Sequence, residues 1–315
     1  MAKYPRLLMF LAMCLFGLIG ILASGVSLPS SVIVLFRGLI GSLFILLVIL
    51  STGKRISSED VRSNLKPLVL SGIFLGLNWL ALFEAYKQTT ISLATLSNYM
   101  APVFVMIVSP FLLRERFTVT KLVCVIISIL GLAMASGVIQ GGMTGDNDLY
   151  GISLGLLAAI CYCGMVMCNK RLGDIGACDR TIVQLSVSTL VVMLYCVLSV
   201  DIGSLTFTTE DVVRLMLLGV VTTGCTFLLY FGTMRYLPAQ TTAIYGYMEP
   251  VVTLLLSALL LSEDLGVAGW IGAALILGST LLCSSLDRGS ETNSPEVNGS
   301  KSLFDESLRS IHDIG

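Results

Sequence analysis

Long apolar runs, separated by short polar or charged loops, make up most of this sequence. Each run is close to the roughly 20 residues that cross the hydrocarbon core of a bilayer as an α-helix. The pattern therefore predicts an all-α integral membrane protein with ten transmembrane helices. The predicted spans are 7–24, 30–50, 67–86, 91–113, 120–139, 151–168, 180–200, 212–234, 241–261 and 266–286.

The composition agrees with membrane insertion. Of the 315 residues, 55% are hydrophobic and 12% are charged, whereas soluble domains carry roughly 25% charged residues. The net charge of −1 and the lack of a basic patch outside the short loops argue against nucleic-acid binding. After Leu286 the composition becomes mostly polar, which predicts a disordered cytoplasmic tail over residues 287–315.

Sequence motifs of the first half of the chain recur in the second half. Tyr99-Met-Ala-Pro102 returns as Tyr247-Met-Glu-Pro250, and Glu115 returns as Glu263, both at an offset of 148 residues. The repeats cover residues 1–140 and 151–286, with five spans each. Because five is odd, the second copy enters the membrane from the opposite side, so the two repeats are inverted, as in carriers that work by alternating access. Each repeated glutamate is expected to cap the helix that follows it.

Positive charges predict the orientation. Lys and Arg residues cluster at the N-terminus, in alternate loops (the sixth, with Arg180, among them) and in the tail. Lys87 and Arg214 alone fall on the other side, and Arg37 alone lies near the middle of a span. Since cytoplasmic loops carry an excess of Lys and Arg, both termini are predicted to be cytoplasmic.

Arg37 is the most informative single residue. An arginine at the centre of a span costs about 2.5–3.5 kcal/mol on insertion scales, so its guanidinium must face an acid, backbone carbonyls or a watery cavity. Two readings stay open: a structural ion pair or carbonyl clamp, and a partner for a carboxylate on the substrate. The matching position of the second repeat lies near Gln184, which is uncharged.

Glu249 is a second ionisable residue inside a span. It precedes Pro250, which cannot donate to the carbonyl of Gly246, and such an interrupted helix must face protein or water. Tyr245 lies one helical turn earlier, on the same face. Glu249 is a possible proton carrier, which would couple transport to a proton gradient. It is alternatively a partner of Arg37 or a direct substrate contact.

Other polar and aromatic residues complete the candidate site. Thr95, Asn98 and Tyr99 share a helix face that is expected to line a cavity. Asn78 is either a hydrogen-bond partner of a neighbouring helix or a reader of substrate, and Trp79 lies beside it. The candidate substrate-binding residues are therefore Arg37, Asn78, Trp79, Thr95, Asn98, Tyr99, Tyr245 and Glu249.

Motifs for other chemistry are missing. The sequence has no Gly-x-x-x-x-Gly-Lys-Ser/Thr loop for ATP and no His-Glu-x-x-His zinc motif. Of the nine cysteines, Cys161 and Cys163 are two residues apart and point to different faces of a helix. We therefore expect no disulfide, no metal, no cofactor and no enzymatic activity.

With its duplicated five-span unit, Phe36-Arg37, Tyr99-Met-Ala-Pro102 and the matching Tyr247-Met-Glu-Pro250, the chain resembles EamA-type members of the drug/metabolite transporter (DMT) superfamily. The resemblance covers about residues 7–286. It implies a ten-helix bundle with a central cavity between the repeats and with the fifth and tenth spans at the periphery. It also implies a secondary carrier, often an exporter, in the cell (inner) membrane.

The leading hypothesis is thus a secondary transporter of a small polar organic metabolite, with an amino acid or related carboxylate favoured and export as the direction. The alternative within transporters is a multidrug or cation exporter that uses Glu249 and aromatic residues. Two rivals come from other classes. One is a non-transporting membrane sensor or assembly subunit, in which the tail would be the active part. The other is a membrane enzyme acting on lipid-linked substrates.

Overall fold

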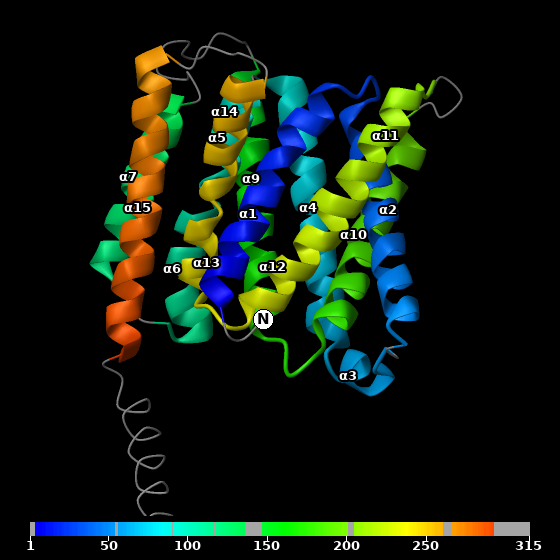
Figure 1. Cartoon of the computed structure of the whole chain (residues 1–315), viewed down its shortest axis with the longest axis horizontal. Helices are drawn as coiled ribbons and strands as arrows, with labels where there is room; N and C mark the ends of the chain where they lie inside the picture. The colour runs from blue at the N-terminus through cyan, green and yellow to red at the C-terminus, as the bar shows by residue number, and fades with distance from the viewer. Residues whose placement is uncertain are drawn as a thin grey trace, which may run out of the picture.

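The protein is a bundle of helices that stand side by side (Figure 1). The computed structural model describes residues 4–53, 56–89, 91–115, 118–135, 147–200, 205–260 and 266–292. The described residues form helices, turns and short connections, and no strand. The helices are α1 (Pro5–Ser24), α2 (Ser30–Ser51), α3 (Ser58–Ser63), α4 (Leu65–Gln88), α5 (Ile91–Asn98), α6 (Ala101–Leu113), α7 (Val119–Ala135), α9 (Asp148–Lys170), α10 (Ala177–Ser199), α11 (Thr209–Leu217), η2 (Leu218–Cys225), α12 (Thr226–Met234), α13 (Ala239–Tyr245), α14 (Met248–Leu260) and α15 (Gly266–Thr292).

Seven stretches of the described chain are long and apolar enough to cross a membrane. They are Pro5–Ser24, Ser30–Ser51, Leu65–Gln88, Leu93–Leu113, Asp148–Lys170, Ala177–Ser199 and Thr209–Met234. The other three predicted spans correspond to shorter apolar elements: Val119–Met134 in α7, the pair α13 and α14, and Val267–Leu282 in α15. The all-helical membrane class is confirmed.

Three helices begin three residues before the apolar runs that predicted them. The first turns of α9, α10 and α11 carry Asp148, Asp179 and Asp211, and acids stabilise a helix N-terminus. A count of apolar residues alone misses these turns. The sequence of Ser57-Ser-Glu-Asp60 also behaves as a helix start, since the Ser57 hydroxyl accepts a hydrogen bond from the Asp60 amide at 3.3 Å and caps α3.

Small residues bring the helix backbones together. A Cβ atom on Gly72 or Gly76 of α4 would lie 2.7–2.8 Å from the side chains of Val187 or Val191 of α10. On α2, a Cβ on Gly41 would lie 2.8 Å from the side chain of Thr223 in the π-helix η2. Close approach of this kind is typical of packed membrane helices. The packing holds α2, the helix that carries Arg37, between α10 and η2.

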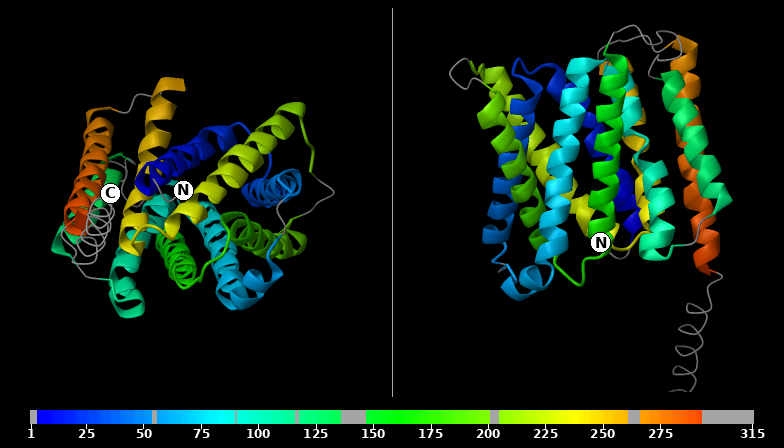
Figure 2. Two further views of the ribbon diagram at one scale, coloured as in Figure 1. Left: turned by 60° about the horizontal axis from the view of Figure 1, so that its bottom comes forward. Right: turned by 180° about the vertical axis from the view of Figure 1, so that it is seen from behind.

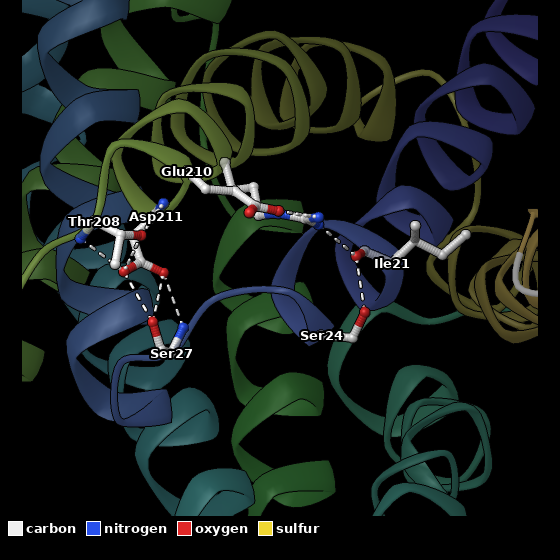
Figure 3. Close-up of polar contacts among 7 residues, drawn as sticks. Ile21, Ser24, Ser27, Thr208, Glu210 and Asp211 are labelled. Carbon is white, nitrogen blue, oxygen red and sulfur yellow. Dashed lines mark hydrogen bonds and ion pairs between the residues drawn. The ribbon is translucent and has the colours of Figure 1, made fainter.

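Asp211 fastens the start of α11 to the loop between α1 and α2 (Figure 3). Its carboxylate accepts hydrogen bonds from the amide and hydroxyl of Ser27 at 2.9–3.0 Å. It also accepts from the amide and hydroxyl of Thr208 at 3.0 and 2.8 Å. Backbone groups that would otherwise be unpaired at this end of the bundle are thus satisfied.

The arrangement of the two outer helices agrees with the family resemblance. α7 and α15 pack on each other at one edge of the bundle, with α2, α10 and α11 toward the opposite edge (Figures 1 and 2). The hydroxyls of Ser128 and Ser279 meet at 2.6 Å in this contact. α1 begins and α15 ends at the same end of the bundle (Figure 1).

The predicted disordered tail and linker fall largely outside the described residues. α15 continues to Thr292, so the first six residues of the predicted tail 287–315 are helical instead. The remainder, residues 293–315, lies outside the described residues, as do residues 136–146 between the repeats.

Candidate functional site

Arg37 lies inside the bundle and faces an aromatic ring. It is 7% exposed, and its guanidinium carbon lies 4.7 Å from the centre of the Trp79 ring on α4, in cation–π geometry. No residue in the described ranges forms an ion pair with it, and its Nε has no hydrogen-bond partner there. A buried cation that is stacked but not neutralised is equipped to receive an anion.

Gln184, near the position of the second repeat that corresponds to Arg37, has a very different environment. Gln184 is completely buried on α10, and its side-chain amide exchanges hydrogen bonds with that of Asn169 at 2.8 and 3.0 Å. The hydroxyl of Ser71 donates to the same Gln184 oxygen at 2.9 Å. This closed network joins α4, α9 and α10, so the polar residue of the second repeat is committed to packing.

An aromatic wall continues from Trp79 across the bundle. The Trp79 and Phe227 rings are 5.9 Å apart, and Phe227 also packs edge-on against Phe16 at 5.0 Å and Tyr230 at 6.3 Å. The hydroxyls of Tyr230 and Tyr162 meet at 2.6 Å. Sequence reasoning missed Phe16 and Phe227 as site residues and left both tyrosines out of the candidate set. Aromatic residues in an apolar run carry no local signal that separates a cavity wall from a lipid-facing surface.

The two proline-interrupted spans both break, and they meet near their breaks. α5 ends at Asn98 and α6 begins at Ala101, while α13 ends at Tyr245 and α14 begins at Met248. Between them, the Tyr247 hydroxyl donates to the backbone carbonyl of Tyr99 at 3.0 Å. Their rings are 6.2 Å apart. Residues exactly one repeat apart thus touch across the interface of the two halves.

The breaks correct two details expected from an unbroken helix. Tyr245 and Glu249 stand in different helices, α13 and α14, so their four-residue spacing does not place them on one face. The carbonyl of Gly246 is also not left free by Pro250, because the Glu249 amide donates to it at 3.2 Å. Tyr245 is buried at the end of α13.

Glu249 lies in the first turn of α14 and is partly buried. Its charge interacts electrostatically with that of Arg37, although the two do not form an ion pair. Tyrosine side chains from three helices and from the break between α5 and α6 interact with it in the same way: Tyr86, Tyr162, Tyr230 and Tyr99. The structure therefore brings one acid, one base and several hydroxyls into a single interior region.

The remaining candidate residues are already engaged with each other. The Asn78 amide donates to the Asn98 side chain at 3.1 Å and to the Ala158 carbonyl at 2.8 Å, which ties α4 to α5 and α9. The Thr95 hydroxyl lies 3.3 Å from the Tyr86 hydroxyl. These contacts fit the reading of Asn78 as a bond between helices, with Asn98 as one of its partners, and they place Thr95 beside Tyr86.

One hydrolase-like pattern is present that sequence reasoning overlooked. Gly151-Ile-Ser153-Leu-Gly155 matches the Gly-x-Ser-x-Gly nucleophile elbow, which requires a sharp strand-to-helix turn. Here the segment lies within α9, and the Ser153 hydroxyl donates to the Tyr150 carbonyl at 2.7 Å. The two glycines serve packing instead: a Cβ on Gly155 would lie 2.9 Å from the Ala94 carbonyl.

Comparison with known proteins gives a consistent result. The pattern of the EamA-like transporter family matches residues 4–137 and again residues 149–285. An uncharacterized transporter of Bacillus subtilis (strain 168), YxxF, is 26% identical over 251 residues, which cover 79% of each chain. The putative permease-like protein YdzE of the same organism is 40% identical over 67 residues, which cover 21% of this chain and 86% of that protein.

A solved crystal structure supports the fold. It superposes with a TM-score of 0.79 at 19% sequence identity and covers 91% of this chain and all of its own. The family pattern spans nearly all of the helical region and occurs twice, as the internal repeat predicts. The protein therefore belongs to the EamA-like transporter family, within the DMT superfamily, and is a multi-span membrane transporter.

Proposed function

We propose that this protein is a secondary transporter that exports a small polar organic metabolite carrying a carboxylate, such as an amino acid or a related acid. The single observation that carries the proposal is the state of Arg37. It is buried, stacked on Trp79, and has no acid paired with it among the described residues. A substrate carboxylate would supply the missing negative charge.

The proposed architecture is ten transmembrane helices in two inverted five-helix repeats. The two separate family matches support it, and so do the two broken helices that meet near their breaks. α1 begins and α15 ends at one end of the bundle (Figure 1), as an even number of crossings requires. The distribution of Lys and Arg supports cytoplasmic termini in the cell membrane. Motion of one repeat against the other would then alternate access to the Arg37 region.

Glu249 is proposed to carry the coupling proton. A carboxyl group in a protein interior readily takes up a proton, because burial disfavours its charged form. Its electrostatic interaction with Arg37 links the two sites.

A second candidate function, export of cations or aromatic drugs, rests on a different observation. Glu249 interacts with four tyrosines, and the wall of Trp79, Phe227 and Phe16 offers ring faces to an organic cation. In that case Glu249 would be the counter-charge of the substrate, and Arg37 would have a structural role.

Substitution of Arg37 distinguishes the two functions. We expect Arg37→Ala to remove most carboxylate transport in proteoliposomes while the protein still inserts and purifies. Arg37→Lys is expected to retain a part, because it keeps the charge but not the planar fork. Arg214→Ala, which removes an arginine paired with Glu210 near the end of the bundle, is the matched control and should transport normally.

Ligand stabilisation gives a second readout. The transported carboxylate, identified from a metabolite panel, should raise the melting temperature of the parent protein more than that of Arg37→Ala. If only cations or aromatic drugs stabilise the parent, and Arg37→Ala responds equally, the carboxylate proposal is wrong and the drug-export function replaces it.

A further inference from the structure

A pocket lies at the end of the bundle where α3 and the start of α1 are found (Figure 1). Its volume is about 410 Å³. Asp60 of α3, the start of α10 and the segment that follows α12 form its walls. None of the lining residues belongs to the Arg37 region, so it is a separate site.

Arg180 is the residue that makes this pocket unusual. The sequence places it at the border between the sixth loop and the span 180–200; in the structure it lies in the first turns of α10 and is 1% exposed. Its Nη1 donates to the Phe231 carbonyl at 3.0 Å. Its Nε and Nη2 have no partner in the described part of the chain. A buried guanidinium with two unmatched donors on the wall of a pocket is half of a bidentate anion site.

The N-terminus of α10 adds to the positive electrostatic potential that Arg180 creates at the pocket. α10 begins at Ala177 after Gly176; no side chain forms a capping hydrogen bond at its N-terminus, although the acid Asp179 lies in its first turn. Free amides and the helix dipole at such an end favour a negative group. Both Gly176 and Ala177 line the pocket, so these backbone groups and Arg180 border one space.

The other charged groups that line the pocket limit which ligands it can bind. Arg235 is paired with Asp174 at 2.6 Å and donates to the Tyr236 hydroxyl at 2.6 Å, so these charges largely cancel at the rim. Asp60 also faces the pocket and forms no ion pair with Arg180 among the described residues. The positive charge left over is that of one guanidinium, opposed by one carboxylate, which suits a single oxyanion group and disfavours a polyanion.

We propose that this pocket binds one oxyanion group, a carboxylate or a phosphate, held by the fork of Arg180 and the first turn of α10. The group comes either from a small soluble molecule or from the head group of an anionic lipid, because the pocket lies at an end of the membrane-spanning bundle. The site is independent of Arg37 and of the proposed transport substrate.

The test uses the full-length protein in a neutral detergent. The melting temperature is measured while sodium phosphate or sodium succinate is titrated against sodium chloride of equal ionic strength. In a separate arm, phosphatidylglycerol is compared with phosphatidylcholine in mixed micelles. We expect a saturable rise with an oxyanion or with phosphatidylglycerol, and none with chloride or phosphatidylcholine. Saturation by the free ions assigns a soluble ligand, and saturation by phosphatidylglycerol alone assigns a lipid.

Variants assign the effect to this pocket. Arg180→Lys should raise the half-saturating concentration roughly tenfold, because lysine cannot form a bidentate pair. Ala177→Asp leaves Arg180 in place and puts a competing carboxylate at the helix start, so it should abolish the response. Its matched control Ala177→Ser should retain it. Arg37→Ala should also retain it, which separates this site from the proposed transport site.

Two results would overturn the proposal. The first is the absence of a saturable rise with any of the three anionic probes in the parent protein. The second is a rise of equal size and concentration dependence in Ala177→Asp. Since Ala177→Asp adds an acid where helices favour one, misfolding of Arg180→Lys would not remove the test.

Discussion

Two kinds of buried polar residue in this transporter bear on its function. In the first, partners are complete: Asn78 bridges three helices, and Gln184 closes a network with Asn169. In the second, a cation keeps unmatched donors, as Arg37 and Arg180 do. Because an unpaired polar group inside a membrane protein costs free energy, the second group marks where a ligand would add most stability. The distinction cannot be drawn from residue type alone.

Replacement of Glu249 tests whether this one side chain carries the coupling proton. Glu249→Gln keeps the size and hydrogen-bonding capacity of the side chain but cannot gain or lose a proton. We expect transport driven by a pH gradient to fall to the level seen without a gradient, while exchange of substrate across the membrane continues. The measurement is uptake into proteoliposomes at a series of imposed gradients.

Glu210→Gln is the control, because Glu210 is an exposed acid whose partner is Arg214 at 2.7 Å. It should respond to the gradient as the parent does. Transport by Glu249→Gln that still follows the pH gradient would exclude Glu249 as the proton carrier.

Among single residues, the sequence pointed to the rare charged candidates for the site and not to the more common aromatic ones. Arg37 and Glu249 stand out because charges inside apolar runs are few. Tyr162, Tyr230 and Phe227 do not, because their neighbours in sequence are equally apolar and only the packing of α9 against α12 brings them together. The burial of Arg180 could not be predicted because it stands at the edge of a run, where one helical turn decides between loop and interior.

At the level of elements, the prolines predicted where the helices break, and the repeat predicted that the breaks correspond. Pro102 and Pro250 each lie just after a break. What the sequence did not indicate is how the freed backbone is satisfied: the Tyr247 hydroxyl reaches the Tyr99 carbonyl from the other repeat. That contact depends on the packing of segments 148 residues apart, which no local pattern encodes.

The glycine contacts between helices give a prediction about stability. A Cβ on Gly72 would lie 2.7 Å from the Val187 side chain and 2.9 Å from the Gln184 carbonyl, which is backbone and cannot turn aside. We expect Gly72→Ala to destabilise the protein by about 1–3 kcal/mol, the usual cost of overpacking. Gly278→Ala, in α15 with open space around the new methyl group, should be neutral or slightly stabilising.

Thermal unfolding of the two variants in the same detergent checks this difference. The close packing of α4 on α10 would be contradicted if Gly72→Ala melted at the same temperature as Gly278→Ala.

For the whole molecule, the contact most relevant to transport joins the two repeats. Glu115 follows α6, and it was expected to cap the next helix in sequence. Its carboxylate instead accepts from the amides of Ala239 at 2.6 Å and Gln240 at 3.3 Å, at the start of α13 in the other repeat. The repeat-related Glu263 lies outside the described residues. This cap ties the two repeats to each other at this end of the bundle.

In the alternating-access mechanism proposed above, the repeats separate at one end at a time, so the Glu115 cap would break whenever this end opens. Glu115→Ala should therefore shift the population toward the open state.

In a cysteine-free background, Ser109→Cys is a suitable reporter of this shift, since Ser109 is fully buried and accepts from the Gln240 side chain at 2.8 Å. We expect labelling by a membrane-impermeant maleimide, applied to the side where α3 lies, to rise roughly tenfold, because a charge-assisted hydrogen bond contributes about 1.5–3 kcal/mol and 1.4 kcal/mol is a factor of ten. Glu59→Ala, which removes an exposed acid from α3 at the same end, should leave the labelling unchanged. Equal labelling of Glu115→Ala and the parent would mean that this cap does not control opening and that the closed end is held by apolar packing alone.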